Sequence, residues 1–126
     1  MLKIGELHLW SAWVGVLVGI VSGAMMGLLF HRDDWLGGYN SWPRRMLRLG
    51  HISFFGIAFL NFAYAATLVV AAKSLHAWAS PMLIAGAILM PAVCALAAWK
   101  KPLRHLFPLP VICLTGAVTL IVWTGV

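Results

Sequence analysis

Acidic residues are almost absent from this chain of 126 residues. Asp and Glu together number three against nine Lys and Arg, charged residues make up 10%, and hydrophobic residues make up 63%. A soluble globular domain is about a quarter charged and roughly half apolar. With a mean hydropathy of +0.95, this composition argues against an ordinary soluble domain and favours a membrane protein.

Charged side chains are also missing from four long apolar stretches, at residues 9–30, 49–72, 77–99 and 106–123. Each is close to the length of about 20 residues that a helix needs to cross a bilayer. Short connections make sequential helices antiparallel neighbours. The sequence therefore predicts an all-α fold, an integral-membrane four-helix antiparallel bundle with residues 1–126 as one transmembrane domain. We expect the first span to be retained, since its apolar run is too long for a signal peptide.

The same absences restrict the possible chemistry. Proton relays and ion pathways normally use ionisable groups inside the membrane, so a stand-alone pump or transporter is not expected. The two cysteines, Cys94 and Cys113, lie within spans and are interpreted as packing residues. No nucleophile–base arrangement or phosphate-binding loop is visible, so no catalytic residue is assigned. A subunit without catalytic activity of its own is favoured over an enzyme.

Basic residues are concentrated in two of the three connections between the spans. Cytoplasmic connections of membrane proteins carry an excess of Lys and Arg. Both termini are therefore predicted to lie outside a bacterial-type inner membrane, with the first and third connections in the cytoplasm. The net charge of +6 is attributed to this topology and to anionic lipid, with no nucleic-acid partner. The seven residues on the predicted inner side are Arg32, Arg44, Arg45, Arg48, Lys100, Lys101 and Arg104, against Lys3 and Lys73 on the other.

The connection between the first two spans contains residues typical of a turn and of a helix start. Gly37 and Gly38 are suited to a turn because glycine tolerates backbone conformations that other residues avoid. Ser41 is a candidate N-cap and Pro43 suits a first helical turn. The second helix is therefore predicted to begin near Trp42, before the apolar stretch itself.

Glycine recurs every four residues along the first span. Residues four apart lie above one another on a helix, so these glycines form a stripe without side chains. Glycine is costly inside a helix, which suggests that something approaches this backbone closely. The alternatives are a neighbouring helix, as in a glycine zipper, or a flat ligand such as haem or a quinone. The stripe comprises Gly15, Gly19, Gly23 and Gly27, preceded by Ser11 and followed by His31 at the same spacing.

Histidines lie near both predicted membrane boundaries. His31 ends the first span and His51 begins the second, so antiparallel packing is expected to bring them to a similar depth as axial ligands of haem b iron. Arg48 is placed to pair with a haem propionate. His8 and His76 form a second candidate pair at the outer boundary.

Two further polar features offer weaker alternatives. A cytoplasmic metal site is conceivable from His31 and His51 with Asp33 and Asp34, although these side chains match no established spacing. Asn61 lies near the middle of the second span and needs a hydrogen-bond partner there. That partner is either another helix or the carbonyl group of a quinone.

Span count and boundary histidines resemble, in outline, the small four-helix cytochrome b or anchor subunits of respiratory and photosynthetic complexes. The usual dihaem pattern, with two histidines on one helix about half a membrane apart, is absent, and no specific family motif is matched. The resemblance implies a small subunit of an electron-transfer complex that binds haem b or borders a quinone site. The alternative is a structural or assembly subunit that docks its glycine-rich first helix against a larger membrane complex.

Overall fold

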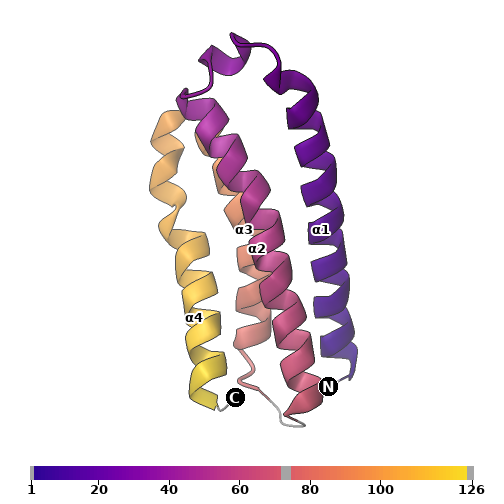
Figure 1. Ribbon diagram of the computed structural model, residues 1–126. Coiled ribbons are helices and arrows are strands. Elements are labelled where there is room, and N and C mark those ends of the chain that lie inside the picture. The colour runs from indigo at the N-terminus through magenta and orange to yellow at the C-terminus, as the bar shows by residue number, and fades with distance from the viewer. Residues whose placement is uncertain (1, 72–74, 125–126) are drawn as a thin grey trace.

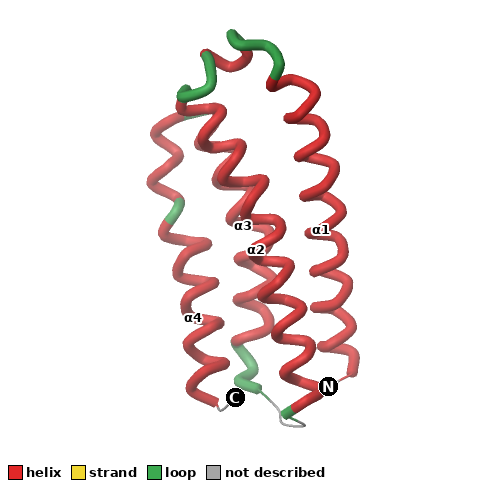
Figure 2. Tube along the Cα trace, viewed as in Figure 1, coloured by secondary structure: helices red, strands yellow, loops and turns green. Residues whose placement is uncertain are grey.

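The protein is seen in a computed structural model that describes residues 2–71 and 75–124. This part of the chain is helical and contains no strand (Figures 1 and 2). The α-helices are α1 (Leu2–Phe30), α2 (Trp42–Val70), α3 (Ala79–Trp99) and α4 (Pro108–Thr124), joined by two short 3-10 helices, η1 (Trp35–Gly37) and η2 (Lys101–Leu106). Four helical segments are long and apolar enough to cross a membrane, and the fourth of them, Lys101–Thr124, comprises η2 and α4.

The helices run alternately up and down, and each packs against the next along the chain. Helices α2 and α3 occupy the centre, with α1 and α4 on either side, and the described ends of the chain lie at the same end of the bundle (Figure 1). The predicted all-helical fold with four long helices is confirmed. A buried apolar cluster joins α2, α3 and α4 and contains Tyr64, Leu68, Leu75, Ala79, Leu83 and Ala117.

The helix boundaries differ from the apolar stretches mainly at the starts of α1 and α2. Helix α1 begins at Leu2, whereas the apolar stretch was predicted from residue 9. Hydropathy marks only the apolar part of a helix, and Lys3 and Glu6 are good helix formers that extend it. The predicted start of α2 at Trp42 is confirmed, with Ser41 Oγ accepting a hydrogen bond from the backbone N–H of Arg44.

The first connection is held on the start of α2 by Arg44. This side chain is only 3% exposed. Its guanidinium group donates to the backbone carbonyls of Arg32 and Trp35 and lies against the rings of Phe30 and Trp35. The carbonyls and the aromatic rings therefore take the place of a carboxylate partner.

Three consecutive residues in this connection have positive φ angles, with values of 52° at Leu36, 85° at Gly37 and 95° at Gly38. The two glycines adopt such angles at little cost, which agrees with the turn predicted for them. Leu36 does not, since positive φ is uncommon for residues with a side chain. The contacts of Arg44 with Arg32 and Trp35 hold the part of the connection that immediately precedes Leu36.

Candidate functional site

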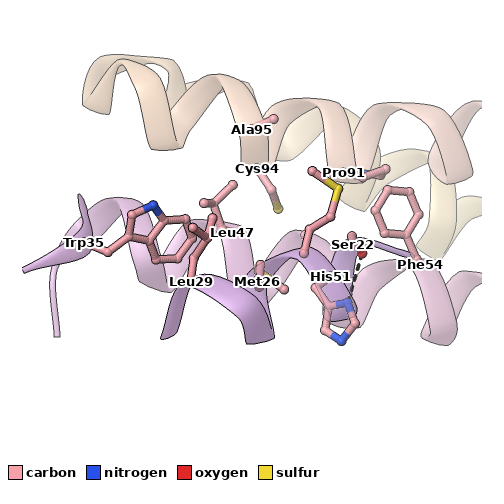
Figure 3. A pocket seen from close by; sticks show the side chains of 12 residues that line it. Ser22, Met26, Leu29, Trp35, Leu47, His51, Phe54, Pro91, Cys94 and Ala95 are labelled. Atoms are coloured by element: carbon pink, nitrogen blue, oxygen red, sulfur yellow. Dashed lines mark hydrogen bonds between the residues drawn. The ribbon is translucent and has the colours of Figure 1, made fainter. Parts of the chain in front are cut away.

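An apolar cavity of about 290 Å³ lies between α1, α2 and α3, at the end of the bundle that η1 covers. Trp35 from η1 lines it at that end, while Pro91 and Cys94 line it from α3 (Figure 3). The remaining wall comes from α1 and α2 and is mostly apolar, including Met26, Leu29, Leu47 and Phe54. Its volume is close to the lower limit of roughly 300 Å³ for small-molecule sites.

Ser22 of α1 and His51 of α2 are the hydrogen-bonding side chains that face each other at this cavity. Ser22 Oγ lies 3.0 Å from His51 Nδ1 and also 3.0 Å from the carbonyl oxygen of Gly19 (Figure 3 shows the first contact). A carbonyl only accepts, so the single hydroxyl proton of Ser22 is donated to Gly19. The serine oxygen then accepts from Nδ1–H of His51.

This arrangement, with Ser22 donating to Gly19, favours the tautomer of His51 that carries its proton on Nδ1. With the proton on Nδ1, a neutral imidazole keeps the lone pair of Nε2 free as an acceptor. Within the described residues Nε2 has no hydrogen-bond partner, and it is not fully enclosed by protein atoms. Figure 3 shows the imidazole at the wall formed by α1 and α2, with Nε2 turned away from Pro91 and Cys94. The ring of His51 thus lines the cavity, while its unused nitrogen points away from the α3 wall.

The glycine stripe of α1 provides the space for these α2 side chains. A Cβ atom at Gly23 would lie 2.6 Å from Cε1 of His51, and one at Gly19 would lie 2.8 Å from the ring of Phe55. At Gly15 it would meet Ala58 Cβ at 3.3 Å. The close approach inferred from the glycines is thus an approach of α2.

The glycine-rich face is therefore unavailable as a docking surface for a larger complex at Gly15, Gly19 and Gly23. Only Gly27 of the stripe has open space where a Cβ would be. The expectation that this stripe receives a partner subunit is corrected on this ground. Helix α2 already covers it within the chain.

The predicted inner haem pair does not form. His51 contacts Ser22 and Gly23, which precede His31 by eight or nine residues, or about 12–14 Å along a helix. The depth estimate was wrong because it placed His51 at the start of α2, whereas His51 lies more than two turns beyond Trp42, and the residue that matches the end of α1 lies near Pro43. Arg48, the expected propionate partner, donates to the carbonyl of Tyr39 at 3.2 Å and lies over its ring.

The predicted outer pair does not form either, because His8 is fully buried in a different contact. Its Nδ1 lies 2.6 Å from Asn61 Oδ1 and its Nε2 lies 2.8 Å from Ser80 Oγ. The Asn61 amide donates to the Ile57 carbonyl, so its oxygen accepts from His8. His76, by contrast, is exposed and accepts a bond from the backbone N–H of Trp78.

We call His8, Asn61 and Ser80 the three-helix clamp, since they come from α1, α2 and α3. Both ring nitrogens of His8 are engaged, so neither is free for haem iron. The hydrogen-bond partner that Asn61 requires is thus supplied by another helix. The ring of Tyr64 packs against that of His8, with centroids 4.3 Å apart.

The alternative metal site is not assembled. Over residues 2–71 and 75–124, no group of three or more His, Cys, Asp or Glu side chains is arranged to hold a metal ion. Asp33 and Asp34 lie exposed in the first connection. The structure thus argues against the metal site proposed from the sequence.

Sequence reasoning missed Ser22, Ser80 and Arg44. The two serines are polar residues within apolar spans, and their need for hydrogen-bond partners could have marked them as contact residues. Arg44 was interpreted only as a charge that sets orientation, and nothing in its sequence context distinguishes it from Arg45.

Comparisons with known proteins give no further assignment. The chain matches no family model, no curated protein and no solved structure.

Proposed function

We propose that this chain is a small multi-pass integral-membrane subunit of an electron-transfer complex that binds a lipid-soluble quinol at the Ser22–His51 cavity. The length and apolar character of its four helices support a location in the bilayer. The distribution of basic residues supports both termini outside and the first and third connections in the cytoplasm.

The observation that carries the ligand class is an apolar cavity lined by the ring of His51, whose Nε2 has no hydrogen-bond partner among the described residues. Apolar pockets with a few polar groups are the usual form of small-molecule sites. Since Nε2 of the neutral ring accepts, its partner must be a donor, such as the hydroxyl of a quinol. A quinone has only acceptor oxygens and would bind less tightly to this tautomer.

Haem b is supported less well than a quinol. Neither proposed histidine pair is assembled, and both nitrogens of His8 are occupied. The described residues therefore do not fit a haem held by two histidines of this chain. A single aromatic ring is also closer in size to a cavity of about 290 Å³.

Each residue of the site has a separate part in binding. Ser22 holds the imidazole by its Nδ1 proton, and His51 accepts the ligand hydroxyl through Nε2. The aromatic face of Trp35 and the apolar walls exclude water from the ring. Exclusion of water strengthens the hydrogen bond, because the local dielectric constant is low.

Binding of a short-chain benzoquinol to the purified protein, kept reduced without oxygen, tests this proposal. We expect saturable quenching of tryptophan fluorescence, because Trp35 lines the cavity. Affinity should fall about tenfold or more in His51→Leu, which corresponds to about 1.4 kcal/mol. The corresponding quinone should bind the wild type more weakly than the quinol.

His105→Ala is the matched control, since His105 is exposed on η2. Equal quinol affinity in wild type and His51→Leu would refute the site. A protein that binds no quinol but co-purifies with a membrane complex would instead support a purely structural subunit.

A further inference from the structure

A second cavity of about 150 Å³ continues from the first along the bundle. It lies between the same three helices, with Gly15 on α1, Ala58 on α2 and Ala87 on α3 among its lining residues. Phe54 lines both cavities and separates them.

The two cavities use one continuous face of each helix. On α1 the lining residues follow a helical repeat from Leu29 through Ser22 to Ser11. On α2 they run in the opposite direction, from Leu47 to Asn61. Ser11 and Leu29 lie 18 positions apart in sequence, which corresponds to a groove about 27 Å long at the rise of an α-helix.

We propose that the ligand of the Ser22–His51 cavity carries a prenyl chain that passes Phe54 and fills this second cavity. This inference rests on the proposed function, since the ring of the same molecule occupies the first cavity. The ligand class is therefore a prenylated quinol, with its ring near His51 and its chain directed toward Asn61.

The chemistry of the second cavity suits a hydrocarbon chain. Ser11 and Asn61 are the polar side chains of an otherwise apolar lining, and the amide and carbonyl of Asn61 are already engaged by Ile57 and His8. An apolar occupant therefore leaves no amide group of Asn61 without a partner. The volume is about half that of the first cavity, so a narrow chain fits better than a second ring.

Continuity with the ring cavity favours the ligand's own chain over a separate bilayer lipid. The chain leaves the ring cavity at Phe54 and meets the next turn of all three helices in order. A separate acyl chain in the second cavity would instead compete with prenylated ligands and leave ring-only ligands unaffected.

Binding of two benzoquinols, one without a side chain and one with a ten-carbon side chain, tests the proposal. Ala87→Phe places a ring in the second cavity and should weaken binding of the tailed ligand at least tenfold. Binding of the ligand without a tail should change less than twofold. Ala87→Leu is the second variant in case the larger residue impairs folding. It obstructs the same position less, so it should also weaken binding of the tailed ligand more than binding of the ligand without a tail, with a smaller loss of affinity.

Ile52→Phe is the control for added apolar volume, since Ile52 is 63% exposed and lines neither cavity. An equal effect of the Ala87 variants on both ligands, or no effect on either, would overturn the chain assignment while leaving the ring site intact. Failure of the ligand without a tail to bind wild type would instead refute the proposed function.

Discussion

His8 and His51 show how one residue type takes two roles according to its hydrogen bonds. In His8 both ring nitrogens are engaged within the three-helix clamp and the side chain is fully buried. In His51 only Nδ1 has a partner among the described residues, and the ring lines a cavity. The first histidine therefore joins three helices, and the second is the proposed ligand contact.

The three-helix clamp should show energetic coupling between its members. Hydrogen bonds between membrane helices contribute about 0.6 kcal/mol on average and at most about 1.7. A double-mutant cycle with His8→Leu and Asn61→Leu, measured by unfolding in mixed detergent, should give a coupling energy in this range. Strictly additive losses would show that the contact is not stabilising. Thr115→Val is the control, because Thr115 is exposed and bonds only within α4.

Gly23 and Gly27 form a matched pair for testing the histidine's position. A methyl group at Gly23 would displace the His51 imidazole, whereas at Gly27 it would enter open space. Gly23→Ala should therefore weaken quinol binding about tenfold, while Gly27→Ala should leave it unchanged. Alanine at position 27 should also raise helix stability by up to about 1 kcal/mol. Equal ligand affinities in the two variants, measured by fluorescence quenching, would contradict this position for His51.

Among the elements, η1 is the one that depends most on a single distant side chain. Arg44 joins η1 to α2 through carbonyls and aromatic rings, and Trp35 of η1 lines the ligand cavity. The order of this short element is therefore coupled to the site. Its conformation also includes Leu36 at positive φ, and such backbone conformations persist only where surrounding contacts hold them.

Arg44→Gln should loosen η1 and leave the helices in place. The expected results are a red-shifted tryptophan emission and faster proteolysis between residues 32 and 41, with unchanged helical circular dichroism. Arg45→Gln is the control, since Arg45 is exposed and adjacent in sequence. A cleavage rate equal to that of Arg45→Gln would show that Arg44 does not hold the connection.

Prediction from sequence succeeded for elements whose signals are local. The start of α2 was readable from Ser41 and Pro43, and the turn from Gly37 and Gly38. The pairing of His31 with His51 failed because relative depth depends on where α2 meets α1. The predicted start of α2 already placed His51 more than two turns beyond Trp42, and the depth match did not take this into account. The cavity likewise requires three helices in their observed register, so its existence was not predictable.

For the whole molecule, orientation in the membrane remains a prediction from the basic residues. The test uses a protein with Cys94 and Cys113 replaced by alanine and a single cysteine at Asn40, which is exposed in the first connection. In intact cells an impermeant thiol reagent should not label it, and permeabilisation should expose it. Labelling before permeabilisation would show that the first connection lies outside, and the predicted orientation and the side of the membrane assigned to the cavity would both be wrong.

The even number of long helices has a practical consequence for protein engineering. Because both described ends of the chain lie at the same end of the bundle, a second copy can be joined to the first by a soluble linker without an added membrane span. In such a tandem protein the His51 site of one copy can be disabled while the other stays intact. Ligand stoichiometry would then be counted directly, one site at a time.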